Sequence, residues 1–244
     1  MIYVTSDLHG HMDCLQKLLA YVDFYGSEDN WLYILGDVID RNNNGGVDIL
    51  KWLLVQPNVQ LILGNHEQML LSNRWIFQEI SDDSISSINS KDMSLLHHWE
   101  LNGGGCTMEA LSQEPFETRK DILEYLEECP LIEGVCVNGK NYVLVHSGLG
   151  NFSKAKKLTD YTQNELLWVR PGLETKYNPE KYVVILGHTP TSFYSREYKN
   201  RILKTESWWD IDTGAAASDG RPMLLCLDNG KEYYIDDKGV VFEE

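Results

Sequence analysis

The chain has 244 residues, of which 43% are hydrophobic, and it carries a formal net charge of −16 at pH 7. A chain of this length can bury one substantial core, and α/β chains of this size commonly form one domain, so we expect a single domain over residues 1–244. The acidic balance argues against a general affinity for nucleic acid or for an anionic membrane, because both depend on clustered Lys and Arg.

The cysteines and the first residues bear on the cellular compartment. The five cysteines form no CxxC pair and are odd in number, which favours neither a disulfide framework nor a zinc ribbon; they are Cys14, Cys106, Cys129, Cys136 and Cys226. No stretch approaches the roughly 18 consecutive apolar residues of a membrane span. Asp7, the first residue with catalytic character, leaves no room for a signal peptide. We expect a cytoplasmic protein in a reducing environment.

In chain order, apolar runs alternate with helical patterns, which is typical of an α/β layered fold. Five runs shaped like buried strands end in residues that can bind a metal, and they read IYVTSDLHG, WLYILGDVIDR, VQLILGNHE, YVLVHSG and YVVILGHTP. Between these runs, helices are expected over residues 11–22, 47–55, 67–77 and 118–128. In the first of them, four apolar residues from Leu15 to Val22 fall at i, i+3, i+4 and i+7, on one helical face.

The stretch between the third and fourth runs differs in character. Residues 81–94 are polar and rich in Ser, Asp and Asn, which predicts a loop, and Gly103-Gly104-Gly105 interrupts the segment that follows. We expect residues 81–130 to form a helical insertion that packs over or beside the functional site. From Tyr182 onward, short strands are expected in YVVILG, WWDIDT, PMLLCL, EYYID and GVVFE.

The residues that end the five runs supply oxygen and imidazole donors without a thiolate, a set suited to manganese, iron or zinc. These candidate metal ligands are Asp7, His9, Asp37, Asn65, His146 and His188. Ligands at the carboxyl ends of several strands converge on one crevice of an open α/β sheet. Alternate side chains of an extended segment share a face, so Asp7 and His9 are expected to point the same way, with Leu8 toward the core.

Asp37 has two carboxylate oxygens and is the candidate bridge between two cations. Asp7 and His9 would hold one cation, while Asn65, His146 and His188 hold the other. Such a pair of cations, about 3.5–4 Å apart, binds a hydroxide, lowers its pKa toward neutrality and holds it in line with a phosphorus atom. The set therefore predicts phosphate-ester hydrolysis in which the metal-bridging hydroxide is the nucleophile.

Hydrolysis also needs a proton for the leaving alkoxide and positive groups for the phosphoryl oxygens. His66 follows Asn65 and is the candidate general acid, with Asp40 accepting a hydrogen bond from its other ring nitrogen. The alternative is that His66 and Asp40 only tie two loops together. Arg41, Asn65 and Arg170 are the candidate contacts to substrate phosphate. For Arg170, in LLWVRP, a surface salt bridge is the alternative.

The five motifs resemble, in the same order, those of the PPP group of phosphoprotein phosphatases within the calcineurin-like metallophosphoesterases. That group has GDxHG, GDxxDRG, GNHE, H-[GA] and GHT, where this chain has SDLHG, GDVIDRN, GNHE, HSG and GHTP over residues 6–190. LLWVRP and ELNGGGCTMEAL are similar to the smaller bacterial and phage members. The resemblance implies a central β-sandwich flanked by helices in αββα layers, and phosphoserine or phosphothreonine as substrate. It also implies two divalent cations, with manganese expected first and iron or zinc as alternatives.

Two residues depart from the family pattern, because Ser6 and Asn42 stand where the family has glycine. Asn enters left-handed backbone more readily than most residues, so we expect Asn42 to preserve the turn after Arg41. The polar stretch from Asn42 to Asn44 is expected to affect substrate preference more than catalysis.

Two further functions are compatible with the same residues. Relatives of this fold hydrolyse dinucleoside polyphosphates such as diadenosine tetraphosphate with the same metal core, and the site residues do not separate this reaction from phosphoprotein hydrolysis. The other is a module that binds phosphorylated partners without hydrolysing them. Its usual signature is a lost ligand or acid, and the sequence retains all of them.

Overall fold

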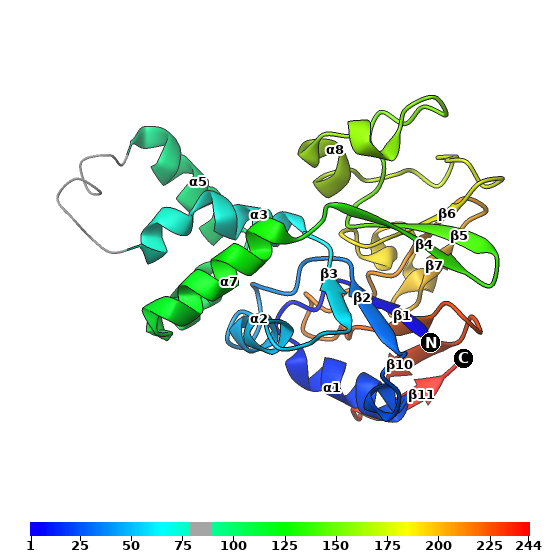
Figure 1. Ribbon diagram of the computed structural model, residues 1–244, viewed down its shortest axis with the longest axis horizontal. Helices are drawn as coiled ribbons and strands as arrows, with labels where there is room; N and C mark the ends of the chain where they lie inside the picture. Colours follow the sequence, from blue (N-terminus) through cyan, green and yellow to red (C-terminus); the bar gives the residue numbers. More distant parts are fainter. Residues whose placement is uncertain (79–88) are drawn as a thin grey trace.

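The computed structural model describes residues 1–78 and 89–244, and it consists of two β-sheets packed face to face with helices on their outer faces (Figure 1). The first sheet is ordered β11 (Val241–Glu243), β10 (Glu232–Ile235), β9 (Leu224–Cys226), β1 (Ile2–Thr5), β2 (Trp31–Ile34) and β3 (Val59–Leu61). The second is ordered β4 (Ile132–Val137), β5 (Lys140–Val145), β6 (Val183–Leu186), β8 (Trp208–Asp210) and β7 (Leu203–Lys204). The expected αββα fold class is confirmed.

Helices occupy the connections between the strands. They are α1 (Met12–Tyr21), α2 (Val47–Leu53), α3 (Asn65–Ser72), α5 (Ser90–Leu101), α6 (Gly105–Gln113), α7 (Phe116–Glu128) and α8 (Gln163–Leu167). Short 3-10 turns add η1 (Phe24–Gly26), η2 (Arg74–Phe77), η3 (Leu158–Asp160), η4 (Thr191–Phe193) and η5 (Arg196–Tyr198). Within the described ranges, no helix combines the length and apolar character that crossing a membrane would need.

Each sheet contains three neighbouring strands that run parallel. In the first sheet β1, β2 and β3 are parallel, and in the second β5, β6 and β8 are parallel. The five runs singled out in the sequence become β1, β2, β3, β5 and β6, so each expected ligand follows the carboxyl end of a strand in a parallel pair. Loops at these ends are where open α/β sheets place their ligands.

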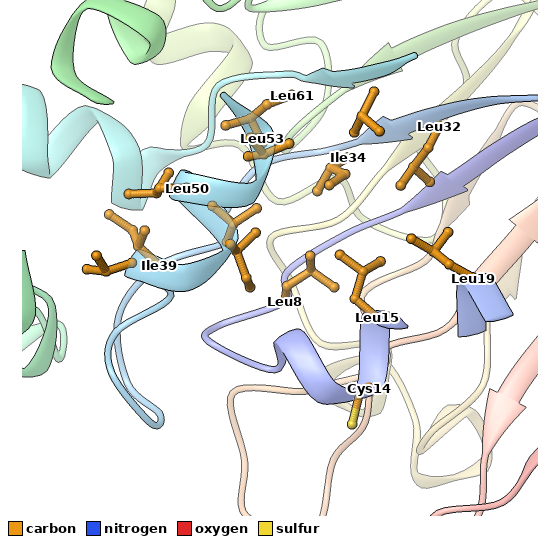
Figure 2. Packing of buried hydrophobic residues seen from close by; sticks show 14 of the residues in the cluster. Leu8, Cys14, Leu15, Leu19, Leu32, Ile34, Ile39, Leu50, Leu53 and Leu61 are labelled. Carbon is orange, nitrogen blue, oxygen red and sulfur yellow. The ribbon is translucent and has the colours of Figure 1, made fainter. Parts of the chain in front are cut away.

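Alternating side chains of the central strands fill the layers on either side of each sheet. On β2, Leu32 and Ile34 pack against α1 and α2, as Figure 2 shows. Val4 of β1 and Leu144 of β5 meet in the cluster between the two sheets, while Val143 packs on the outer face near α8. Each such fully buried aliphatic side chain contributes about 1.5–3 kcal/mol to folding, so the layers fix the strand ends.

Residues 90–94, expected to be a loop, form the first turns of α5, while residues 81–88 of the expected loop lie outside the described residues. The side chain of Asn89 accepts the backbone N–H groups of Lys91 and Asp92 at 2.9 and 3.2 Å, and Asp92 accepts the N–H of Asn89 at 3.1 Å. This reciprocal capping starts a helix in polar sequence. The strands β4 and β7 were also not expected, and both gain their order by antiparallel pairing at a sheet edge.

The helices α5, α6 and α7 form an arm, defined here as residues 89–128. Figure 1 shows α5 and α7 extending away from both sheets. The buried face of the arm includes Trp99, Leu111, Ile122 and Leu126, which belong to the same hydrophobic cluster as the residues of α1 and α2. The arm is therefore packed onto the sheets through the main core.

Candidate metal centre

The loops that carry the candidate ligands leave their strands through left-handed backbone. β1 ends at Thr5, and Asp7, His9 and Asp37 have φ values of 49°, 40° and 54°. The expectation that Asp7 and His9 share one face of an extended segment is therefore wrong. The first loop instead bonds to the second, with the His9 N–H donating to the Asp37 carbonyl at 2.9 Å. Leu8, between the two, is fully buried in the core as expected (Figure 2).

Asp37 lies at the centre of the converging side chains. Its Oδ2 atom is 4.0 Å from Nε2 of His9, and its Oδ1 atom is 3.4 Å from Nε2 of His146. Two sets of three donor atoms, with the atoms of each set within 4.8 Å of one another, share this residue. One set is Asp37 with His9 and His66, and the other is Asp37 with His146 and His188. This is the position that a carboxylate bridging two cations requires.

The second set contains lone pairs that face one another. The Nε2 atom of His146 is 2.8 Å from Oδ1 of Asn65 and 3.2 Å from Nδ1 of His188. The Nδ1 atom of His146 is 2.7 Å from the carbonyl oxygen of Leu35, which can only accept a hydrogen bond. The single N–H of a neutral imidazole is therefore used there, and Nε2 meets the oxygen of Asn65 with a lone pair. A cation between these atoms removes the repulsion.

The other histidines are also in the form that binds metal. His9 has its Nδ1 atom 2.8 Å from the Ile39 carbonyl, which leaves Nε2 for a cation. Burial lowers the pKa of His146 to about 3 and that of His188 to about 2, and it lowers the pKa of His9 well below its usual value. The buried Nε2 of His188 has no partner among the described residues. Neutral imidazoles with a free nitrogen are ligands without further deprotonation.

Buried carboxyl groups gather around the same point. Burial, reinforced by the nearby charge of Asp212, raises the pKa of Asp7 well above its usual value. Burial, reinforced by the charge of Glu67, raises the pKa of Asp37 in the same way. Carboxylates held together away from water repel one another, and paired positive charge offsets that repulsion. The arrangement is one that divalent cations stabilise.

Neighbouring side chains hold the loops that bear these carboxyl groups. Glu67 accepts the backbone N–H groups of Asp37 and Gly64 at 2.8 and 3.0 Å. The hydroxyl of Ser6 donates to the side chain of Asp7. The replacement of the family's glycine by Ser6 therefore adds a donor that orients a candidate ligand.

The donor set fits a pair of divalent cations, because neutral imidazoles and an amide oxygen direct lone pairs toward the same point as the buried carboxyl groups. We propose that one cation is held by Asp7, His9 and Asp37, and the other by Asp37, Asn65, His146 and His188. When bound, the cations would supply an activated water for in-line attack and positive charge for the phosphoryl oxygens.

His66 lies beside the centre and is engaged at both ring nitrogens. Its Nδ1 atom is 2.6 Å from Oδ2 of Asp40, and its Nε2 atom is 3.1 Å from Nη2 of Arg41. Because a guanidinium can only donate, Nε2 accepts from Arg41 and Nδ1 donates to Asp40. Burial, with the charge of Arg41, lowers the pKa of His66 to about 3, while burial raises the pKa of Asp40 to about 7. The structure thus brings together the pair expected from the sequence.

The rim of the centre carries exposed cationic and aromatic side chains. Arg170 is exposed, and its guanidinium lies 5.9 Å from the ring centroid of Phe193. Its positive charge helps to lower the pKa of His188, so Arg170 is close enough to act on the centre. Trp168, two residues earlier, is 38% exposed, and its ring centroid is 6.1 Å from that of His188.

Sequence reasoning did not identify Asp212, which is 3% exposed and follows β8. Its charge acts on both Asp7 and Asp37, and it raises the pKa of each. A signal was present, because WWDIDT ends an apolar run in DxD just as IYVTSDLHG ends one in DxH. The strand-end argument that found the other acidic residues applies equally to this run.

Asn42 does not adopt the left-handed backbone that the sequence suggested. The left-handed φ values near it belong to Asp40, Arg41 and Asn43, at 72°, 71° and 50°. The side chain of Asn42 instead donates to the carbonyl of Ala215 at 3.2 Å. The turn around Arg41 is therefore formed by its neighbours on both sides, and Asn42 ties it to the loop after Asp212.

The fold and this centre define a phosphoesterase of the αββα class with a candidate metal-binding cluster of His and Asp. The chain belongs to the calcineurin-like phosphoesterase family, whose family model matches residues 1–226. Two solved structures resemble the chain in fold, at 18% and 16% identity. One, provisionally named a diadenosine tetraphosphatase, has a TM-score of 0.57 and is matched over 100% of this chain and 92% of its own. The other, a serine/threonine phosphatase of Saccharomyces cerevisiae, has a TM-score of 0.56 over 99% and 78%.

Curated relatives share one name. Bis(5'-nucleosyl)-tetraphosphatase, symmetrical, of Chromobacterium violaceum is 31% identical over 136 residues, which are 52% of this chain and 48% of that protein. The protein of the same name from Haemophilus influenzae is 33% identical over 100 residues, 40% of this chain and 36% of that protein. The matched segments thus span about half of these relatives' length or less.

Proposed function

We propose that this protein hydrolyses dinucleoside tetraphosphates, such as diadenosine tetraphosphate, at the central phosphoanhydride. One water molecule is consumed, and two nucleoside diphosphates are released. The observation that carries the proposal is the name shared by the relatives at 31% and 33% identity. Membership of the calcineurin-like phosphoesterase family supports the phosphoester chemistry itself. Phosphoserine and phosphothreonine hydrolysis, which the PPP-like motifs imply, is the second candidate.

The aromatic rim supports a nucleotide over a phosphopeptide. Trp168 and Phe193 are 38% and 68% exposed, a large share for aromatic side chains beside a buried polar centre. The indole N–H of Trp168 donates to Gln68 at 3.0 Å, which holds the ring at the edge of the site. Stacking of a nucleobase on an aromatic ring is worth about 1–3 kcal/mol, and a phosphoserine side chain has no base to stack.

Arg41 and Arg170 suit the charge of a polyphosphate chain. Both residues are exposed, and both guanidinium charges act on the buried centre. Each can give a bidentate contact to phosphate oxygens, and a tetraphosphate offers several phosphates where a phosphomonoester offers one. Two divalent cations, with manganese as the first candidate and iron or zinc as alternatives, would meet the phosphate under attack.

His66 is placed to donate a proton to the leaving oxygen. While Arg41 donates to its Nε2 atom, the imidazole is neutral and its pKa is held low by burial and by the guanidinium charge. A substrate phosphate that engages Arg41 frees Nε2, and its negative charge raises the pKa of His66. The imidazole can then carry a proton on Nε2, while Asp40 accepts from Nδ1 at 2.6 Å.

A substrate comparison tests the proposal. The purified protein, supplied with manganese, is assayed on diadenosine tetraphosphate and on a phosphothreonine peptide, and the nucleotide products are separated. We expect ADP as the sole nucleotide product and a kcat/KM at least about 100-fold higher for the nucleotide, the size of one or two stacking contacts. Near-exclusive hydrolysis of the peptide would identify a phosphoprotein phosphatase instead. No turnover of either substrate, or of p-nitrophenyl phosphate, with any divalent metal would favour a binding module.

A further inference from the structure

Asp40 receives hydrogen bonds from the arm. The carboxylate is fully buried, and its Oδ2 atom accepts the indole N–H of Trp99, in α5, at 2.8 Å. Its Oδ1 atom accepts the hydroxyl of Thr107, in α6, at 2.5 Å. The same hydroxyl oxygen accepts the backbone N–H of Asp40 at 3.1 Å. Both donor side chains are fully buried, so these contacts are shielded from water.

The arm also contacts the residue that follows Asp40. The backbone N–H of Arg41 donates to the carbonyl of Gly103 at 3.1 Å, and its Nε atom is 3.4 Å from the carbonyl of Asn102. Asp40 and Arg41 both have left-handed φ values, of 72° and 71°. Non-glycine residues adopt this backbone only when their surroundings hold them there. The connection between α5 and α6 provides part of that support.

The Gly103-Gly104-Gly105 break explains how the arm comes so close. A Cβ on Gly104 would lie 2.4 Å from the indole nitrogen of Trp99, and a Cβ on Gly103 would lie 2.8 Å from Cγ of Arg41. On the other side, a Cβ on Gly45 would lie 2.4 Å from the hydroxyl of Thr107. A Cβ on Gly103 or Gly45 would therefore push the arm away from Arg41 and Asp40, and a Cβ on Gly104 would displace the indole of Trp99 that donates to Asp40.

We propose that Trp99 and Thr107 are positioning residues for proton transfer, so that the arm is part of the catalytic machinery. The proposal rests on the assignment of His66 as the proton donor. Trp99 and Thr107 each occupy one carboxylate oxygen of Asp40 and fix the plane of that carboxylate. Its remaining lone pair on Oδ2 then faces Nδ1 of His66 at 2.6 Å, which sets the direction of Nε2 toward the leaving group.

The dependence of the rate on the leaving group tests this role. p-Nitrophenolate is a weak base and leaves as the anion without a proton. Phenolate is a stronger base, so phenyl phosphate is hydrolysed faster when an acid protonates the leaving oxygen. The test compares kcat on p-nitrophenyl phosphate with kcat on phenyl phosphate for the metal-loaded protein. The ratio of the two values from one preparation cancels the fraction of active protein, so partial unfolding of a variant does not obscure the result.

We expect Trp99→Phe and Thr107→Val to lower kcat on phenyl phosphate by about 10-fold, part of the roughly 10²–10⁴-fold that a general acid supplies. On p-nitrophenyl phosphate the loss should stay below about 3-fold. Thr107→Ser keeps the hydroxyl and should restore the parental ratio. Trp75→Phe is the matched control, because the buried indole N–H of Trp75 has no acceptor among the described residues. Its ratio should equal that of the parent.

Equal losses on both substrates in Trp99→Phe and Thr107→Val, which leave the ratio unchanged, would overturn the positioning role. The absence of any loss on phenyl phosphate would overturn it as well. His66→Asn separates this failure from that of the acid assignment. If His66→Asn loses activity chiefly on phenyl phosphate while the two arm variants do not, only the role of the arm is wrong. If His66→Asn loses both substrates equally, His66 is not the acid, and the role of Trp99 and Thr107 falls with it.

Discussion

Asp37 is shared by both sets of donor atoms, so its removal should affect both cations of the proposed centre. In Asp37→Ala, each cation loses a carboxylate ligand, and the charge between the two sites is no longer neutralised. We expect the metal content after dialysis to fall from about two ions per chain to less than one. The measurement is elemental analysis of the dialysed protein. Asp121→Ala, at an exposed position of α7, is the control and should keep both ions. Two ions in Asp37→Ala would show that Asp37 is not the bridge.

Trp168 is the residue that should separate nucleotide binding from general phosphate binding. Trp168→Ala removes an exposed ring that packs edge-on against His188 but leaves every candidate ligand residue in place. If a base stacks there, KM for diadenosine tetraphosphate should rise about 10-fold, which corresponds to about 1.4 kcal/mol of stacking. Steady-state kinetics on p-nitrophenyl phosphate provide the comparison, and there kcat/KM should change by less than about 3-fold. Trp168→Phe should keep most of the nucleotide affinity. Equal effects on both substrates would argue against a base at this position.

At the residue scale, the convergence of the candidate side chains could be predicted from the sequence, but the backbone conformation of their loops could not. The candidate ligands follow parallel strands, and parallel strands bring their carboxyl ends together whatever the loops do. The left-handed φ values of Asp7 and His9 depend on hydrogen bonds to a second loop, so no local pattern reports them. Asp212 was missed although WWDIDT ends an apolar run in DxD, because only the pairing of β8 with β6 shows that this run is parallel to the strands that carry the other ligands.

Substitutions in the connection between α5 and α6 test how closely the arm must approach the site. Gly103 has φ of 96°, and a Cβ there would lie 2.8 Å from Cγ of Arg41. Gly103→Ala should therefore cost about 1–2 kcal/mol in the free energy of unfolding, because left-handed backbone is unfavourable for alanine. Displacement of Arg41 should also raise KM for phosphorylated substrates. Urea denaturation and steady-state kinetics measure the two effects.

Gly105 offers a matched control two residues away. A Cβ at Gly105 meets nothing within 4 Å, and the residue begins α6. Gly105→Ala should leave KM unchanged and should leave stability equal or up to about 1 kcal/mol higher, since alanine favours a helix. If Gly103→Ala behaves like Gly105→Ala in both assays, the close contact between the arm and Arg41 contributes neither to stability nor to substrate binding.

At the element scale, the sequence predicted the strands that carry ligands and most helices, but not the arm's contact with Asp40. The start of α5 was readable in principle, because Asn89 and Asp92 have the spacing of a capping box. The contacts of Trp99 and Thr107 with Asp40 join residues 59 and 67 positions apart. Their partners are set by tertiary packing of the arm, which no periodic pattern within the arm reveals.

For the whole molecule, the buried acidic groups make stability depend on pH when metal is absent. Burial raises the pKa of Glu67 to about 7 and that of Asp212 to about 6, above their values in an unfolded chain. The stability that these groups contribute is fully present below about pH 4 and is lost as pH rises from about 4 through 6 to 7, because over this range the folded state holds protons that the unfolded chain has already released. Burial lowers the pKa of His146 to about 3, so its contribution is lost in the opposite direction, as pH falls below about 6.5.

Above pH 6.5 the histidine contribution is complete, whereas Asp7 and Asp37, whose pKa values burial raises well above the usual range, still hold protons in the folded state. The metal-free protein should therefore become less stable between pH 6.5 and 8. Divalent metal should reverse this trend, because Asp7 and Asp37 must lose their protons to bind it and do so more readily at higher pH. At about 100 times its dissociation constant, a metal bound to one site adds about 2.7 kcal/mol. For a chain of this length that raises Tm by roughly 5–10 °C.

The measurement is the Tm of the protein with a chelator and with manganese at pH 6 and at pH 8. The difference between the two conditions should be larger at pH 8, and it should disappear in Asp37→Ala. A difference that is equal at both pH values would mean that the buried carboxyl groups do not exchange protons for metal.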